Sequence, residues 1–405
     1  MNFKVLSLIL LTVVCGYNLF LQIVSYLSKN NPTPDNVKDL YDEDTYKKWR
    51  AYHGETSRVG ILSTLASFIL YFILIAFNVL PRAAAAQNPY VSMILVVLLF
   101  FTLDAVVSGI FSYIYTMKID EKYGFNKRTM KTFLLDQVKS YVVSTGLVIG
   151  LTSLLILIYE HMGDWMLVLF SGVMVAFLFI VMFLYPFFSR LYNQFTPLED
   201  GELKDKLTAL LQKNGYKVRA IQVMDASKRT TKSNAYFSGY GKTKTIVLFD
   251  TLLASMTTDE IVAVFAHELG HGLHRDVIKK SLITSLQMVA LVVIAWLTVR
   301  TESIYPDFGF AGRNYGLALI LVLISQFPLL SPLFSVIAGA VSRRAEYRAD
   351  AQAVKEGFGQ ALISGLKKLS KDNLADLAPS PIEVTLTYSH PPLSQRIAAI
   401  EKAMK

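Results

Sequence analysis

The stretch FAHELGHGLHRD, residues 265–276, contains the pattern H-E-x-x-H. An α-helix turns by about 100° per residue, so His267 and His271 would lie on one face, one turn apart. Two imidazole nitrogens placed in this way suit one Zn²⁺ ion at about 2.0–2.1 Å. Glu268 would lie beside them, where its carboxylate can take a proton from a zinc-bound water as general base. The pattern predicts metal-assisted hydrolysis with one catalytic zinc ion.

Short H-E-x-x-H matches also occur by chance, and the alternative is a polar helix end with two histidines at an interface. The chain has six histidines, and three of them, His267, His271 and His274, fall within eight residues, which favours the metal. On a regular helix His274 would share their face but lie about 10 Å beyond His267, too far to bind the same ion. We therefore exclude His274 from the predicted ligands.

A catalytic zinc ion takes three protein ligands and keeps one position open for water. The segment SRRAEYRADAQAV, residues 342–354, places Glu346 and Asp350 four residues apart, on one face of a predicted helix. Glu346 could complete a His₂Glu set, and Asp350 could hold a ligating histidine by its other ring nitrogen. An amphipathic surface helix with ordinary charges explains the same spacing, so the residues alone leave both interpretations open.

Two further segments carry groups that could contact a substrate. SNAYF, residues 233–237, could pair with an extended peptide as a strand edge, with Asn234 donating to a carbonyl, although residue type alone favours a plain turn. YSHPPLSQR, residues 388–396, offers His390 and Arg396 to stabilise the oxyanion formed during peptide hydrolysis. The alternative for the second segment is a loop histidine before a turn fixed by proline.

The composition predicts a membrane protein. Of 405 residues, 53% are hydrophobic and only 18% are charged, and the mean hydropathy is +0.41. A soluble protein of this size could not bury so much apolar surface. The net charge of +9 fits basic cytoplasmic loops better than nucleic-acid binding, so we expect the lipid bilayer and no nucleic acid as a partner. The single cysteine, Cys15, excludes an internal disulfide framework.

A membrane-spanning helix needs about 20 predominantly apolar residues. We count seven such segments, at 5–27, 60–80, 90–117, 140–158, 165–188, 278–299 and 314–340. Basic loops alternate with loops poor in Lys and Arg along this series, which places the N-terminus outside and the C-terminus in the cytoplasm. The first segment begins like a signal peptide, but its apolar run is long and no small-residue cleavage site follows, so we expect a retained span.

Two regions outside the spans have patterns of soluble structure. In the first, LKDKLTALLQKNG (203–215) has helical periodicity, whereas VRAIQVMDA (218–226) and KTIVLFD (244–250) are typical of strands. The connection between the two strands is rich in turn formers. The second region, the tail from residue 341, is predicted to be helical with a proline-rich interruption at 379–392.

Four motifs stand in the order found in the zinc-dependent CAAX prenyl proteases, which are integral-membrane gluzincins: N-A-Y-F at 234–237, H-E-L-G-H at 267–271, S-R-R-A-E-Y-R-A-D at 342–350 and Y-S-H-P-P at 388–392. The likeness continues through segments 121–139, 191–204 and 227–253, and so covers nearly the whole chain. By this resemblance the chain is identified as a member of that family. It is shorter than eukaryotic members, which favours a bacterial relative.

The resemblance implies a role for each matching residue. Those that match the zinc ligands are His267, His271 and Glu346. Glu268 matches the general base, and Asp350 matches a carboxylate behind the ligands. The residues that match substrate-strand positions are Asn234 and Ala235, and those that match groups near the reacting carbonyl, which we count with the catalytic residues, are His390 and Arg396.

The resemblance also implies a mainly α, polytopic membrane protein. Seven transmembrane helices would enclose an intramembrane chamber, with a small α+β zincin-like metalloprotease domain on the cytoplasmic side. The expected division is five spans over 1–190, the zincin-like segment over 191–277, spans six and seven over 278–340, and a cytoplasmic part with the third ligand over 341–405.

Members of the family cut prenylated CAAX peptides and remove the last three residues. We therefore expect a membrane-embedded zinc metalloendopeptidase whose substrate is a peptide or protein, in the bacterial inner membrane or, in a eukaryote, the endoplasmic reticulum. The first alternative is a quality-control zinc protease with no prenyl requirement, although such enzymes have about four spans. A transporter with an incidental H-E-x-x-H is a second. A site-two type protease is a third, but its motif would lie inside a span.

Overall fold

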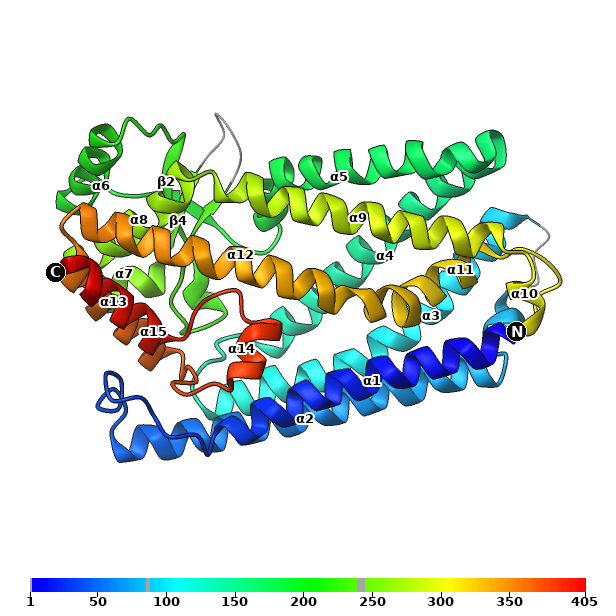
Figure 1. The fold of residues 1–405 in the computed structure, drawn as a ribbon, viewed down its shortest axis with the longest axis horizontal. Coiled ribbons are helices and arrows are strands. Elements are labelled where there is room, and N and C mark those ends of the chain that lie inside the picture. Colours follow the sequence, from blue (N-terminus) through cyan, green and yellow to red (C-terminus); the bar gives the residue numbers. More distant parts are fainter. Residues whose placement is uncertain (1, 85–87, 239–244) are drawn as a thin grey trace.

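The computed structural model describes residues 2–84, 88–238 and 245–405. Long helices run along the longest axis of the molecule, and the N-terminus and the C-terminus lie at opposite ends of that axis (Figure 1). The strands and most of the short helices gather at the end that carries the C-terminus. The predicted mainly α architecture with a small α+β part is confirmed.

The long helices are α1 (Phe3–Ser28), α2 (Glu43–Ala76), α3 (Pro89–Tyr113), α4 (Met130–Met162), α5 (Met166–Ser189), α9 (Asp276–Arg300) and α12 (Phe327–Lys355). The shorter helices are α6 (Glu202–Lys213), α7 (Asp250–Ser255), α8 (Thr258–Leu273), α10 (Ile304–Asp307), α11 (Tyr315–Leu321), α13 (Gly359–Asp372), α14 (Pro381–Thr387) and α15 (Leu393–Met404). Single turns of 3₁₀-helix lie at η1 (Leu80–Ala83), η3 (Gly163–Trp165) and η4 (Ala226–Lys228), and π-helical turns at η2 (Ile114–Asp120) and η6 (Val322–Gln326).

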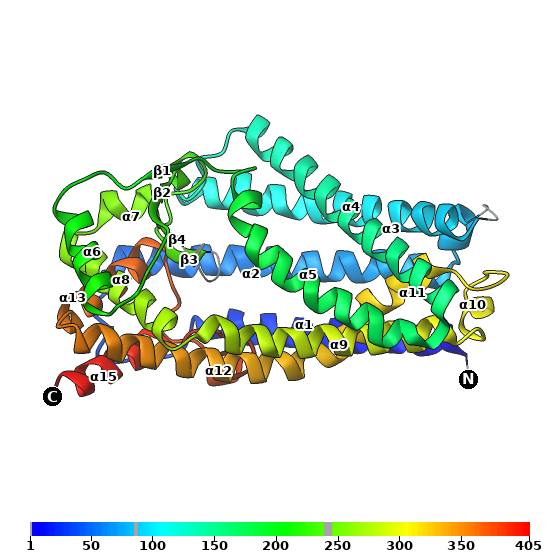
Figure 2. The same ribbon diagram turned by 90° about the horizontal axis from the view of Figure 1, so that it is seen from above.

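Six continuous helical stretches of the described chain are long and apolar enough to cross a membrane. One of them, Met130–Tyr185, is 56 residues long and contains η3. Gly163, whose φ is 55°, ends α4 there, and α4 and α5 diverge from this bend in both views (Figures 1 and 2). Our fourth and fifth predicted spans lie on the two sides of the bend. Because the two chain termini lie at opposite ends of the molecule, an odd number of membrane crossings is expected. The predicted number of seven membrane spans stays a prediction.

The two largest hydrophobic cores of the described residues lie at the two ends of the molecule. One lies at the end that carries the sheet and the C-terminus, from Trp49 on α2 through Phe265 on α8 to Ile397 on α15. The other closes the opposite end, around Met93 on α3 and Tyr305 on α10. The apolar windows of the candidate spans are only 11% to 39% buried. Such low burial is expected of helices that face lipid, and the chamber stays a prediction.

The four strands form one mixed sheet in the order β1-β2-β4-β3. The predicted strands are β2 (Ala220–Met224) and β4 (Thr245–Phe249), which pair in parallel. β1 (Phe195–Pro197) pairs antiparallel with β2. β3 (Ala235–Ser238) pairs antiparallel with β4 and forms an edge of the sheet. The plain turn favoured by residue type at 233–237 is therefore wrong, because pairing with β4 decides the conformation of this segment.

The last apolar segment continues without a break into the region predicted to carry the third ligand. Residues Tyr315–Lys355 form one helical stretch of 41 residues through α11, η6 and α12. The proposed boundary at residue 340 thus falls inside a helix, and Glu346 is held on an extension of the last span. Within the predicted interruption at 379–392, the structure adds the short helix α14, which begins at Pro381.

Candidate active site

The H-E-x-x-H motif lies in the second half of α8, and the start of this helix is well determined. Thr257 caps it, its side chain accepting from the backbone N–H of Glu260, while the Glu260 carboxylate accepts from the backbone N–H of Thr257. The stretch Ile261–Ala266 is buried in the core at the end that carries the sheet, so the helix is fixed by packing as well as by its cap. His267 and His271 then follow on a rigid element.

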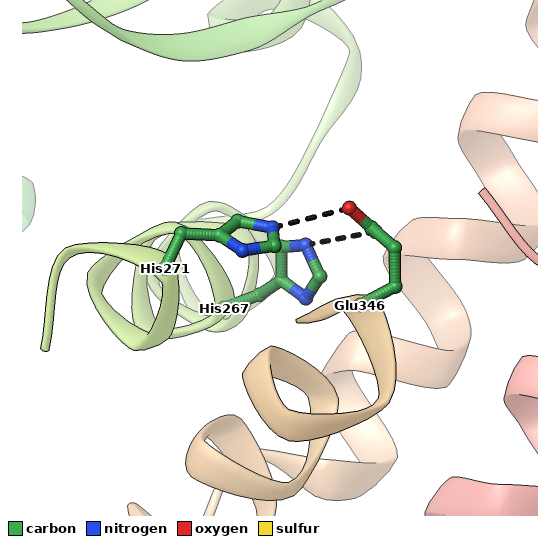
Figure 3. Close-up of side chains that lie close together, drawn as sticks. All are labelled: His267, His271 and Glu346. Atoms are coloured by element: carbon green, nitrogen blue, oxygen red, sulfur yellow. Dashed lines mark ion pairs between the residues drawn. The ribbon is translucent and has the colours of Figure 1, made fainter. Parts of the chain in front are cut away.

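Three side chains meet between α8 and α12. His267 and His271 project from α8 toward Glu346 on α12 (Figure 3). His267 Nε2 lies 3.4 Å from one carboxylate oxygen of Glu346, and His271 Nε2 lies 3.2 Å from the other. One ligand atom from each residue lies within 4.8 Å of the others. The structure thus brings the predicted third ligand, Glu346, beside the two predicted histidines, and their role as metal ligands stays a prediction.

These residues fit a divalent metal ion. Glu346 is 2% exposed, and its Oε2 atom is buried without a hydrogen-bond partner in the described part of the chain. His267 Nε2 and Arg396 Nη1 each lie 3.4 Å from this oxygen, beyond ordinary hydrogen-bond distance. A buried carboxylate oxygen that makes no hydrogen bond is costly, and a metal ion between the three side chains would compensate it. Two imidazoles and one carboxylate form a donor set used by catalytic zinc sites. His274 lies outside this group, exposed at the end of α8.

The Nδ1 atom of His267 is held from behind by two buried residues. It lies 2.8 Å from Oδ1 of Asp350, which is one turn beyond Glu346 on α12. The Arg396 guanidinium binds both Asp350 oxygens, through Nε at 3.0 Å and Nη2 at 2.6 Å. A carboxylate on Nδ1 leaves Nε2 free to bind a metal, and this is the arrangement predicted for Asp350.

Arg396 lies deeper than its predicted role near a carbonyl implies. It is 9% exposed, and two of its three nitrogens are used by Asp350. The remaining atom, Nη1, lies 3.4 Å from Glu346 Oε2. Arg396 therefore contacts the carboxylates that surround the candidate metal position, and contact with a substrate stays a prediction.

Asp276 supports His271 in the same way, although no role was predicted for this residue. His271 Nδ1 lies 3.1 Å from Asp276 Oδ2, and Asp276 also accepts from Arg348 at 2.7 Å. The chain reaches this position through Arg275, whose φ of 54° is left-handed and turns α8 into α9. The sequence did contain a signal for Asp276: each ligating histidine needs a hydrogen-bond partner for its second ring nitrogen, and Asp276 follows His271 closely.

We expect Asp276→Asn to weaken zinc binding by about 10–100-fold, the range typical of residues behind metal ligands. The amide keeps the size of the side chain but removes the charge that orients His271. Titration of the chelator-treated protein with zinc measures this change, with Asp307→Asn at the opposite end of the molecule as control. An unchanged zinc affinity in Asp276→Asn would contradict the role.

The protonation of the site depends on burial and on the carboxylates. Burial alone lowers the pKa of His267, but hydrogen bonds with Asp350 and Glu346 raise it to about 9. A proton must therefore leave this histidine when a metal binds. Burial also raises the pKa of Glu268, against the opposing effect of His267 and His271. A carboxylate with a raised pKa is better matched to proton transfer near neutral pH.

His390 approaches the three ligands from the chain between α14 and α15. Its Nε2 lies 3.4 Å from Glu346 Oε1, and its side chain is 63% exposed. Desolvation lowers the pKa of His390, against the opposing effect of the Glu346 carboxylate. The structure thus brings this predicted residue to the site, with its ring open to a ligand.

The edge strand β3 lies against α8. The carbonyl of Asn234 accepts from the N–H of Phe249 at 3.1 Å, so Asn234 directs its carbonyl toward β4. Because inward and outward groups alternate along an antiparallel strand, Ala235 and Phe237 direct their N–H and C=O groups away from β4. The Asn234 side chain accepts from the Ala235 N–H at 2.9 Å. The outer edge of β3 can pair with an extended peptide.

Gly270, the glycine of H-E-L-G-H, is required by the close approach of α8 and α12. A Cβ atom at this position would lie 2.8 Å from Ala349 Cα and 3.1 Å from Gln352 Cβ. We expect Gly270→Ala to destabilise the protein by about 1–3 kcal/mol, because backbone must shift. The shift separates Glu346 from the two histidines, so zinc affinity falls as well. Thermal unfolding with and without zinc measures both effects, and Gly146→Ala, in open space on α4, is the control.

Comparison with known proteins supports these observations. The family model "Peptidase family M48" matches residues 197–404. The model "CAAX prenyl protease N-terminal, five membrane helices" matches residues 22–193. CAAX prenyl protease 1 of Saccharomyces cerevisiae is 31% identical, covering 91% of this chain and 88% of that protein. The human CAAX prenyl protease 1 homolog is 29% identical, covering 92% and 89%.

The fold and the site define a membrane-embedded metallopeptidase. The crystal structure of S. mikatae Ste24p superposes with a TM-score of 0.91 at 28% identity, covering 98% of this chain and 99% of that one. The chain belongs to peptidase family M48, with the N-terminal membrane helices of the CAAX prenyl proteases.

Proposed function

We propose that the chain is a zinc metalloendopeptidase that cuts near the C-terminus of CAAX-type substrates and removes the AAX tripeptide. The observation that carries the proposal is the meeting of His267, His271 and Glu346, one of whose carboxylate oxygens makes no hydrogen bond within the described chain, on a helix that packs against the edge strand β3. The names of the relatives support the substrate class, since curated proteins of similar length are called CAAX prenyl protease 1. We also propose that the substrate carries a prenyl group.

In this mechanism His267, His271 and Glu346 hold the metal, and bound zinc supplies a Lewis acid and a water whose pKa is about 7. The substrate backbone pairs with the outer edge of β3, where Ala235 offers its carbonyl and Asn234 offers its amide. Glu268 accepts a proton from the attacking water and delivers it to the leaving amine. His390 donates a hydrogen bond to the substrate carbonyl oxygen as that oxygen gains negative charge.

The remaining groups act by position. Asp350 and Asp276 fix the two histidine rings, and Arg396 holds Asp350 in place while its Nη1 faces Glu346. The proposed topology keeps the N-terminus outside and the site in the cytoplasm, where water and the C-terminal ends of proteins are available. The proposed membrane is the bacterial inner membrane, or the endoplasmic reticulum in a eukaryote.

The test compares a farnesylated CAAX peptide with its non-prenylated twin, incubated with the full-length protein and analysed by mass spectrometry. The proposal predicts loss of the last three residues from the farnesylated peptide and a much smaller rate for its twin. Equal cleavage of both would assign the enzyme to the alternative, a quality-control protease with no prenyl requirement. Cleavage of neither by the zinc-loaded protein would remove the CAAX substrate.

A further inference from the structure

A basic pocket lies where the membrane part meets the protease end, outside the catalytic group. It has a volume of about 460 Å³ and is formed by the start of α4, the residues after α5, and the chain around η4. Its basic lining residues are Lys127, Arg190, Lys228 and Arg229. We call it the α4–α5 pocket.

The charges of the α4–α5 pocket are only partly neutralised. Lys228 binds Asp225 at 2.5 Å, and Arg229 binds Asp136 at 3.3 Å. Lys127 and Arg190 make no ion pair with any residue that the structure describes. Four basic groups thus face two acidic groups, a net of two positive charges, and the two unpaired cations are both exposed.

The start of α4 adds to this positive environment. Thr129 caps the helix and Thr132 follows in its first turn, and both line the pocket. A helix of 33 residues places its positive dipole end and free N–H groups here. The two hydroxyl groups hydrogen-bond to each other at 3.1 Å, which leaves one O–H free to donate. A cavity with a net positive charge, a helix N-terminus and one hydroxyl donor suits a phosphate group.

The surroundings of the pocket distinguish a lipid from a soluble phosphate. Along the first turns of α4, Leu134 and Val138 are 54% and 59% exposed. At the end of α5, Phe183 and Phe187 are 57% and 63% exposed. Arg190 follows directly, and it also lines a second pocket with these two phenylalanines. Acyl chains can lie along these apolar turns while a headgroup enters the α4–α5 pocket.

We propose that the α4–α5 pocket binds the phosphate headgroup of an anionic phospholipid from the leaflet on the protease side. Basic pockets next to the ends of transmembrane helices recognise such headgroups. Arg190 and Lys127 contact the phosphate, and Arg229 is held by Asp136 as a fixed wall. Arg229 also belongs to the segment that leads to β3, so the lipid binds beside the chain that carries the substrate edge.

The test measures binding of a fluorescent phosphatidic acid to the full-length protein in phosphatidylcholine nanodiscs. The variant Lys127→Gln/Arg190→Gln/Lys228→Gln removes three positive charges from the pocket. Each basic group near a membrane surface contributes about 1 kcal/mol, so we expect about a hundredfold weaker binding. The control Lys38→Gln/Lys47→Gln/Lys402→Gln removes the same charge from exposed sites elsewhere on the protease end and should bind like the wild type.

Equal phosphatidic acid binding by the two triple variants would overturn the proposal. A second arm titrates soluble glycerol 3-phosphate, and binding as tight as that of the lipid would assign the pocket to a free phosphate instead. If the pocket triple variant does not fold, Lys127→Glu alone serves, because the Lys127 side chain is exposed and unpaired within the described chain. Wild-type lipid affinity in Lys127→Glu would equally contradict the site.

Discussion

Replacing Glu268 by Gln is expected to lower kcat by about a thousandfold while zinc binding is retained, since general acid–base groups contribute about 10²–10⁴-fold. The amide has the size of the carboxylate, so α8 and its packing stay intact. It cannot accept the proton of the attacking water. Glu268 is not one of the three candidate ligands, so metal content by mass spectrometry should equal that of the wild type.

The matched control is Asp259→Asn on the same helix. Asp259 pairs with Lys206 at the surface, where it is 64% exposed, so this variant loses one carboxylate of α8 without touching the site. Its cleavage rate should stay within about twofold of the wild type, because exposed ion pairs contribute little. If Glu268→Gln cleaved as fast as Asp259→Asn, another group would have to be the base.

The second large effect is expected for Glu346→Ala, which should lose both zinc and activity. Residues behind the ligands change metal affinity by about 10–100-fold, and removal of a ligand should exceed that range and the change in Asp276→Asn. Added zinc should raise the melting temperature of the chelator-treated wild type but not of Glu346→Ala, because only a bound ligand stabilises the fold.

Glu401→Ala controls for the loss of a carboxylate, since Glu401 is exposed on α15. It should show the same zinc-dependent rise in melting temperature as the wild type. A rise of the same size in Glu346→Ala would show that the metal binds elsewhere. The melting temperatures of the metal-free wild type and Glu346→Ala are compared first. Similar values show that the variant is folded, so a missing response to zinc then reflects the missing ligand.

Much of the site could be predicted because its chemistry is local. His267, Glu268 and His271 occupy one helix, and the spacing of Glu346 and Asp350 is again that of one helix face. Neither spacing predicted that α8 and α12 would pack against each other. It depends on Gly270, which admits Ala349 at a distance that no other side chain permits.

The sequence-based predictions were wrong or incomplete where tertiary contacts decide the local structure. The segment 233–237 has the residues of a turn, yet hydrogen bonds with β4 make it a strand edge. Asp276 gained its role through the left-handed conformation of Arg275, which no residue pattern indicated. The apolar segments of the spans were found easily, since about 20 apolar residues in succession depend on no distant partner.

The most direct measurement is an anomalous difference map at the zinc absorption edge, from crystals of the full-length protein. The account predicts one strong peak, within coordination distance of His267 Nε2, His271 Nε2 and the Glu346 carboxylate. A map without a peak between α8 and α12, from crystals of protein shown to contain stoichiometric zinc, would contradict the account.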